Sequence, residues 1–342
     1  MESRKVMNQV DVAIPCYNYG RYLRACVESI LSQDGVSVRV LIIDDASSDD
    51  TAEIGQSLAL EDRRVQFRRH VQNVKNIATF NEGIDWAEGE YFLILSADDY
   101  LLPGSLRRAA AVFMEHPDVV LACGQAIVSR EEERFQVHAP AQQPAGFQLI
   151  SGRTFIESLC ADSANNPIWS PTAVVRTSAQ KRAGGYSAQI PHAGDLEMWL
   201  RFARLGSIAV LNSFQAVYRR HSSNMHVSYA GVSNLRQHLL AFESAIADFA
   251  GEIDDREILQ KCYRRGLAMG AIRAANHALN EEDRARYQEA VSFAIDVDPT
   301  IRRTLKWQEM QFRRLIGPQG VSLLRKARSA VRPRSSAQRA TW

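Results

Sequence analysis

Short apolar runs alternate with amphipathic segments along the first half of the chain. Segments with the composition of strands, most of them built on a run of apolar residues, occur at 10–18, 38–47, 65–70, 90–99 and 119–128. Apolar residues at helical spacing lie between these runs, at 22–33, 47–59, 77–87 and 105–116. Alternation of apolar strands with helices is typical of a parallel sheet covered by helices. We therefore predict an α/β fold with a mostly parallel sheet flanked by helices.

The second half begins with a segment that we interpret as a loop and continues with mixed elements. Residues 130–150 contain an acidic cluster and a stretch rich in Ala, Gln and Pro. Beyond it the pattern indicates strands at 171–177 and 207–221, a helix at 194–206, and helices from about 231 to 293. We expect three parts, an α/β domain at 1–228, a helical region at 229–320 and a basic, flexible tail at 321–342.

The ends of the expected strands carry the most unusual residues. Ligands of α/β sheets bind beyond the carboxyl ends of the strands. Three such ends carry Pro15 to Asn18, Asp44 with Asp45, and Asp98 with Asp99. Two adjacent carboxylates beside a core are costly unless they are paired or bind a cation. We expect the three strand ends to meet at one crevice, with something positive beside Asp98.

Composition narrows the class of protein further. The chain has 342 residues, 46% of them hydrophobic, and a net charge of +2 that points to no particular partner, so we expect no nucleic acid. The five cysteines are odd in number, far apart and without a C-x-x-C pair, which favours a reducing compartment over a disulfide framework. We see no signal peptide and no apolar stretch of the roughly 18 residues that span a bilayer. A cytoplasmic protein is expected.

Several common motifs of nucleotide-binding and metal-dependent enzymes are absent from the sequence. There is no G-x-G-x-x-G, no G-x-x-x-x-G-K-[ST] and no H-E-x-x-H, which argues against a dinucleotide enzyme, a P-loop NTPase and a zincin.

Asp49 and Asp50 suit the cap of a helix, whereas Asp45 can accept hydrogen bonds from a base or a ribose. Asp98 and Asp99 suit either a turn or a Mg²⁺ or Mn²⁺ ion shared with a diphosphate.

Two further segments carry candidate chemistry. Asp195 and Glu197 can simply complement a helix dipole, yet they follow a glycine-bearing loop, where an acid can act as a general base. His221 is either a satisfied surface histidine or, beside two arginines, a group that meets a metal or a diphosphate.

Taken together and in their order along the chain, the segments that carry these candidate residues resemble the family 2 glycosyltransferases with a GT-A fold. The similarity covers residues 8–224 and is carried by VAIPCYNYGRYLRACVESILSQ, VLIIDDASSDDT, NIATFNEGIDWAEGEYFLILSADD, GGYSAQIPHAGDLEMWLRFARLG and YRRH. Such a fold is a Rossmann-like sheet, here followed by a helical C-terminal region.

The resemblance implies a role for each matching residue. The nucleotide would be held by Pro15, Tyr17, Asp45, Asn76 and Asp99. Asp98 and His221 would hold the metal, and Asp195 would be the catalytic base. The chain departs from the family pattern at Ser96 and Gly194, where many members have an acid.

An inverting transferase of surface-polysaccharide type is the function that the resemblance implies. The donor would be a nucleotide-sugar, with a UDP-sugar expected, and the acceptor a hydroxyl of a glycan or a lipid-linked glycan. Trp169 can stack on an acceptor sugar or belong to the core, and the basic tail can contact anionic lipids on the inner membrane face or stay solvated. Two rivals remain: a non-catalytic nucleotide-sugar or glycan-binding protein, and a nucleotidyltransferase, which should carry a more basic, Gly-rich first loop.

Overall fold

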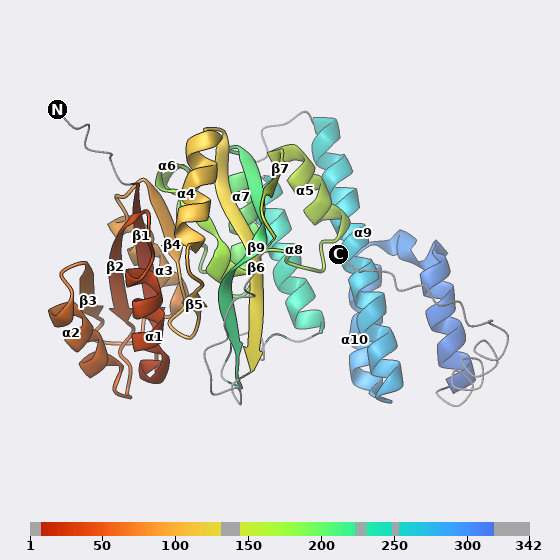
Figure 1. The fold of residues 1–342 in the computed structure, drawn as a ribbon. Coiled ribbons are helices and arrows are strands. Elements are labelled where there is room, and N and C mark those ends of the chain that lie inside the picture. The colour runs from red at the N-terminus through yellow and green to blue at the C-terminus, as the bar shows by residue number, and fades with distance from the viewer. Residues whose placement is uncertain are drawn as a thin grey trace, which may run out of the picture.

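A single mixed sheet runs through the molecule, with helices on both of its faces (Figure 1). The computed structural model describes residues 8–130, 144–222, 224, 229, 231–247 and 253–317. Its strands are β1 (Gln9–Cys16), β2 (Ser37–Asp44), β3 (Val65–Arg69), β4 (Tyr91–Ile94), β5 (Tyr100–Leu101), β6 (Val119–Arg130), β7 (Phe147–Ile150), β8 (Val174–Arg176) and β9 (Ser207–Arg220).

The strand order is β3-β2-β1-β4-β8-β6-β9-β5, with β7 paired to β9. Strands β3, β2, β1 and β4 are mutually parallel, and β6 is parallel to β9. Between these groups β8 is antiparallel to both β4 and β6. The mostly parallel α/β sheet expected from the sequence is therefore confirmed, and the antiparallel β8 separates its two parallel parts.

The central strands are buried on both faces, which explains their uninterrupted apolar sequence. In β4, Tyr91 and Leu93 join one hydrophobic cluster, while Phe92 between them joins the cluster on the opposite face. Side chains alternate across a strand, so such a strand needs apolar residues at every position. The strand ends at Ile94 because the following residues, Leu95 to Asp99, leave the sheet and carry the acids beyond its edge.

Helices pack on both faces of the sheet. They are α1 (Gly20–Leu31), α2 (Thr51–Glu61), α3 (Asn76–Trp86), α4 (Ser105–Glu115), α5 (Gly152–Ala161), α6 (Thr177–Ala183), α7 (Gly194–Ala203), α8 (Val232–Ala247), α9 (Ile253–Asn280) and α10 (Arg284–Val297), with 3-10 turns η1 (Ser170–Thr172) and η3 (Pro299–Arg303). Residues of α1 and α4 pack in the cluster on one face, and residues of α3, α5 and α7 in the cluster on the other.

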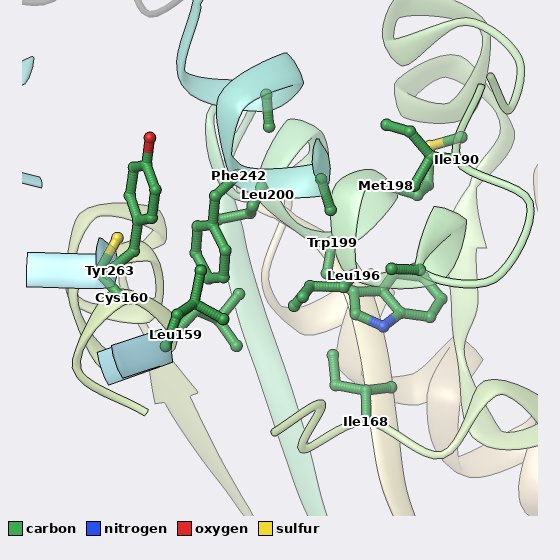
Figure 2. Packing of buried hydrophobic residues seen from close by; sticks show 14 of the residues in the cluster. Leu159, Cys160, Ile168, Ile190, Leu196, Met198, Trp199, Leu200, Phe242 and Tyr263 are labelled. Atoms are coloured by element: carbon green, nitrogen blue, oxygen red, sulfur yellow. The ribbon is translucent and has the colours of Figure 1, made fainter. Parts of the chain in front are cut away.

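The C-terminal helices share the second of these clusters. Figure 2 shows Leu159 of α5, Trp199 and Leu200 of α7, Phe242 of α8 and Tyr263 of α9 in one apolar group. The rings of Phe242 and Tyr263 are stacked with their centroids 5.0 Å apart. Beyond this contact α9, α10 and η3 extend away from the sheet (Figure 1). The division at residue 228 stays a prediction, as does the one at residue 320.

The sequence pattern did not predict α5, α6, β5 or β7, and the strand expected at 171–177 is shorter in the structure, where β8 covers Val174–Arg176. Strand β7 lies in the segment interpreted as a loop, most of which (131–143) is outside the described residues, and the expected tail lies beyond residue 317. In the described part of the chain no helix is both long enough and apolar enough to cross a bilayer.

Candidate active site

A pocket of about 500 Å³ lies at the carboxyl ends of β1, β2 and β4. Seven of the residues that the sequence singled out line it, contributed by three strand ends, α3 and α7: Pro15, Tyr17, Asp45, Asn76, Asp98, Asp99 and Asp195. His221, the eighth, lies directly behind Asp98. The expected convergence of the strand ends on one crevice is what the fold shows.

Asp98 and His221 form a buried pair. His221 Nε2 lies 2.9 Å from Asp98 Oδ2, and the amide of Asn224 donates to the same oxygen at 3.1 Å. The imidazole stacks on the ring of Tyr22, with the centroids 5.7 Å apart, and its edge meets Tyr19. His221 is only 7% exposed, so its alternative reading as a surface histidine is wrong.

The pair leaves two polar atoms without a protein partner. Asp98 Oδ1 and His221 Nδ1 are both buried and accept or donate no hydrogen bond. A buried, unpaired carboxylate oxygen is costly, and it is a ligand atom of the kind that Mg²⁺ and Mn²⁺ prefer. Among the described residues no three His, Cys, Asp or Glu side chains form a closed metal cluster. An ion held by one carboxylate and completed by diphosphate and water oxygens fits this donor set.

Asp99 also lines the pocket and is held by β9. Its Oδ1 accepts a hydrogen bond from the backbone N–H of Arg219 at 2.9 Å. The guanidinium of Arg219 donates to the carbonyl oxygen of Asp98 at 2.8 Å and packs over the rings of Tyr22 and Tyr100. Burial, and then the neighbouring charge of Asp98, raise the pKa of Asp99 well above its ordinary value. Arg219 thus fixes the backbone that carries both acids.

Asp45 organises the opposite side of the pocket. Its Oδ1 lies 2.8 Å from His70 Nδ1 and accepts from the backbone N–H of Val74, and its Oδ2 accepts from the N–H of Lys75 at 3.0 Å. The other nitrogen of His70 lies 2.7 Å from Glu82. Burial alone would lower the pKa of His70, but its hydrogen bonds to the two carboxyl groups outweigh burial and raise it.

Lys75 is held in an unusual conformation at the edge of this pocket. Its φ of 74° and ψ of 163° lie in a region that is almost reserved for glycine and costs a side-chain-bearing residue about 1–3 kcal/mol. The exposed side chain lines the pocket just before Asn76, whose amide contacts the carbonyl oxygen of Pro191 at 3.4 Å.

Asp195 stands in the first turn of α7 and is held by two hydroxyl groups. Ser170 of η1 donates to its Oδ2, and Tyr186 donates a second hydrogen bond. Burial raises the pKa of Asp195 and outweighs these two hydrogen bonds, which act in the opposite direction. A carboxylate with a raised pKa is a stronger base than a free aspartate, so this group suits proton removal.

The loop before α7 explains why position 194 is a glycine. A Cβ at Gly194 would lie 2.9 Å from a ring carbon of Tyr186, the residue that bonds Asp195. The loop is anchored by Arg201, which donates to the carbonyl oxygens of Ala183 and Gly185 and pairs with the buried Glu197 at 2.5 Å. Glu197 therefore has a structural role, whereas Asp195 faces the pocket.

Other residues in the segments that the sequence singled out are not among the expected site residues. Asp49 accepts hydrogen bonds from the N–H and the hydroxyl of Thr51, the first residue of α2, and from the N–H of Gly20, whereas Asp50, the N-cap residue, makes no side-chain cap hydrogen bond. Trp169 is partly buried against Tyr218 and is not part of the pocket lining. Arg219 and Asn224 were missed as organisers of the acids, although both lie within six residues of His221 in the segment YRRHSSN.

Comparison with known proteins places this geometry in context. The family model described as Glycosyl transferase family 2 matches residues 11–177. An uncharacterized glycosyltransferase of Rickettsia typhi is 25% identical over 202 residues, which cover 58% of this chain and 60% of that protein. Hyaluronan synthase of Pasteurella multocida is 25% identical over 239 residues, 69% of this chain but 23% of the synthase.

Solved structures share the fold at low sequence identity. S. aureus TarS 1–349 in complex with UDP-GlcNAc superposes with a TM-score of 0.57 and 18% identity, over 86% of this chain and 92% of that one. The mannosyltransferase PcManGT of Pyrobaculum calidifontis, in complex with GDP-Man and Mn²⁺, has a TM-score of 0.53 and 16% identity, over 85% and 86% of the two chains.

Proposed function

Because this chain belongs to glycosyl transferase family 2, with the GT-A fold and glycosyltransferase activity of that family, we propose that it is a metal-dependent, inverting enzyme of surface-polysaccharide synthesis. It would move a sugar from a nucleotide-sugar, with a UDP-sugar expected, to a hydroxyl of a glycan or lipid-linked acceptor.

One observation carries the proposal. The same pocket contains an unpaired carboxylate oxygen, Asp98 Oδ1, and a second carboxylate, Asp195, whose pKa is raised. Transfer of a sugar from a nucleoside diphosphate sugar needs two functions. The charge on the leaving diphosphate has to be neutralised, and a base has to take the proton of the attacking hydroxyl.

The nucleotide would lie at the ends of β1 and β2. Pro15 and the exposed ring of Tyr17 would flank it, while Asp45 and Asn76 would meet the polar edges of the base or ribose. Oδ2 of Asp45 accepts only from Lys75 and keeps a second accepting site, whereas Oδ1 is already engaged by His70 and Val74. Asp99 would stay fixed by β9 and shape the floor of the site.

Asp98, assisted by His221, would hold Mg²⁺ or Mn²⁺ through the oxygen that no protein group occupies. When bound, such an ion neutralises the charge that builds on the departing diphosphate. Arg219 and Asn224 hold the acids in position from behind. The mannosyltransferase PcManGT, which shares the fold, binds Mn²⁺ together with GDP-Man, and this supports a metal ion at Asp98.

Asp195 would take the proton from the acceptor hydroxyl. Ser170 and Tyr186 orient the carboxylate, and its raised pKa brings its basicity closer to neutral pH. The hydroxyl oxygen then bonds to the anomeric carbon as the bond from that carbon to the nucleoside diphosphate breaks. Attack from the face opposite the leaving group inverts the anomeric centre.

The acceptor class rests on relatives and on charge. The hyaluronan synthase relative builds a polysaccharide, which supports a glycan acceptor. The expected basic tail would suit a lipid-linked one at an anionic membrane surface. All five cysteines are free, as suits a reducing compartment such as the cytoplasm.

A nucleotide-release assay tests the proposal. Wild-type protein is incubated with Mn²⁺ or Mg²⁺ and a panel of UDP-, GDP- and dTDP-sugars, beside Asp195→Asn and Asp98→Asn. We expect release from one donor, lost with a chelator and in both variants. Tight donor binding without release, even with glycan acceptors present, would instead support a non-catalytic binding protein.

A further inference from the structure

Residues 305–317 form a helix that follows η3 at the far end of the C-terminal region. One side of this helix packs against the rest of the protein. Met310 is fully buried there and Trp307 packs against the same cluster. Arg313 donates to the side-chain oxygens of Asn276 and Asn280 in α9, which fixes the rotation of the helix.

The opposite side of the helix presents large apolar side chains to solvent. Leu305 is 76% exposed, Phe312 53% and Leu315 83%. Spacings of seven and three residues place the three side chains on one face. Met310 follows Leu305 by five residues, which is more than a third of a turn away from that face. The helix therefore turns an apolar stripe of three large side chains outward, with Gln308 and the salt-bridged Glu309 on the same face.

The segment that carries this stripe is basic. Residues 299–317 contain five basic residues and one acid, Glu309. Lys306 pairs with Glu309 at 3.0 Å and Arg313 bonds α9, so the exposed Arg302, Arg303 and Arg314 carry the net charge of this segment. The sequence that follows, 318–342, carries six more basic residues and no acid.

We propose that the face made by Leu305, Phe312 and Leu315 is a docking surface for an anionic lipid membrane. An outward apolar stripe flanked by basic residues is the pattern of a helix that lies in the interface of a bilayer. The apolar side chains would enter the acyl boundary while the arginines meet lipid phosphates. A protein partner of ordinary composition offers no comparable density of negative charge over an apolar layer.

This proposal goes beyond the transfer reaction and does not depend on the donor or the base. It implies that the catalytic pocket works beside a membrane, where a lipid-linked acceptor would be found. The pocket itself contains none of the residues involved.

Vesicle flotation of the full-length chain tests the surface directly. The protein is mixed with vesicles of phosphatidylcholine alone or with about 30 mol% phosphatidylglycerol. The test variant carries Leu305→Gln, Phe312→Gln and Leu315→Gln. A matched control carries Leu60→Gln, Met114→Gln and Leu240→Gln, three apolar residues that are also exposed but lie on α2, α4 and α8.

We expect wild type and control to float with the anionic vesicles and not with the neutral ones, and high salt to weaken the binding. The test variant should bind at least about tenfold more weakly, with an unchanged circular dichroism spectrum and thermal midpoint. Equal binding by the test variant would overturn the proposal in favour of the tail alone. Absence of wild-type binding, or a wild-type dimer in sedimentation that the test variant abolishes, would assign the stripe to another role. Donor hydrolysis in free solution, measured separately, should be the same for all three proteins.

Discussion

Replacement of Asp195 by asparagine separates the chemical role of this residue from its structural one. Asparagine has nearly the same shape and keeps an oxygen that can accept from Ser170 or Tyr186, but it cannot take a proton. Loss of a positioned general base costs about 10²–10⁴-fold in rate. That is about 3–5 kcal/mol of transition-state stabilisation. We expect a fall in kcat of this size with little change in the dissociation constant of the donor.

The pH dependence of the wild-type rate gives a second, independent measurement. A base must be ionised to act, so kcat/KM should rise with pH through the pKa of Asp195. That pKa is raised, so the midpoint should lie above the value of about 3.9 of a free aspartate. The hydrogen bonds from Ser170 and Tyr186 lower the pKa, and Ser170→Ala or Tyr186→Phe should therefore move the midpoint to still higher pH. Ser158→Ala in α5 is the matched control and should leave it unchanged.

Stability should respond to Asp195→Asn in the opposite direction to activity. A carboxyl group whose pKa is higher in the folded protein than in the unfolded one holds more protons when folded. The free energy of unfolding then falls as pH rises from the unfolded pKa through the folded one. Asparagine carries no such penalty, so the variant should gain in thermal midpoint relative to wild type at pH 7 and lose that gain near pH 3.

Release assays and thermal melts over pH 3–9 check all three expectations. The reasoning would be refuted by an Asp195→Asn variant that releases nucleotide within about threefold of the wild-type rate. A midpoint that moves to lower pH in Ser170→Ala would show that the carboxylate is not the titrating base. A variant that unfolds at neutral pH would show that the ionised group stabilises the fold.

Three further substitutions probe the rest of the pocket. Asp98→Asn should remove most of the Mn²⁺-dependent nucleotide release, by about 10²-fold or more, and isothermal titration in the presence of donor should show weakened metal binding. Lys75→Gly should raise the free energy of unfolding, measured in urea, by about 0.5–2 kcal/mol, because relief of the strained backbone outweighs the entropy of glycine. An unchanged urea midpoint would contradict the strained conformation. Gly194→Glu should destabilise the protein by about 1–3 kcal/mol and slow turnover, because its Cβ would displace the ring of Tyr186; a thermal midpoint equal to that of wild type would show that the ring yields freely.

Much of the catalytic half could be predicted from the sequence because its strands are buried on both faces. A strand such as β4 must be apolar at every position, and the first acids after it mark where the sheet ends. For that reason Asp45 and Asp98 could be assigned to one edge of the sheet from the sequence alone, and both line the pocket there. The start of α2 could be predicted in the same way, since Asp49 accepts from the N–H of Thr51, the first residue of that helix, two positions along the chain.

Long-range contacts account for the features that the sequence did not predict. Strand β8 lies within the strand expected at 171–177, but its antiparallel pairing with both neighbours is specified by no local pattern. Gly194 looked like a lost acid in the sequence, but the close approach of Tyr186 explains it as a packing requirement. The role of Arg219 likewise depends on β9 lying beside the turn that carries Asp98.

The sequence by itself determined the alternation of strands and helices, the strand ends that carry acids, and the family to which those segments belong. These properties follow from local periodicity and from residue chemistry, which are written in consecutive positions. Only the tertiary structure decided that Asp98 keeps a buried oxygen without a protein partner while Asp99 accepts from the backbone of Arg219, that burial raises the pKa of Asp195, and that Leu305 faces solvent. The partners of Asp98 and Asp99, His221 and Arg219, lie more than 100 positions away in the chain, and local patterns cannot specify such partners.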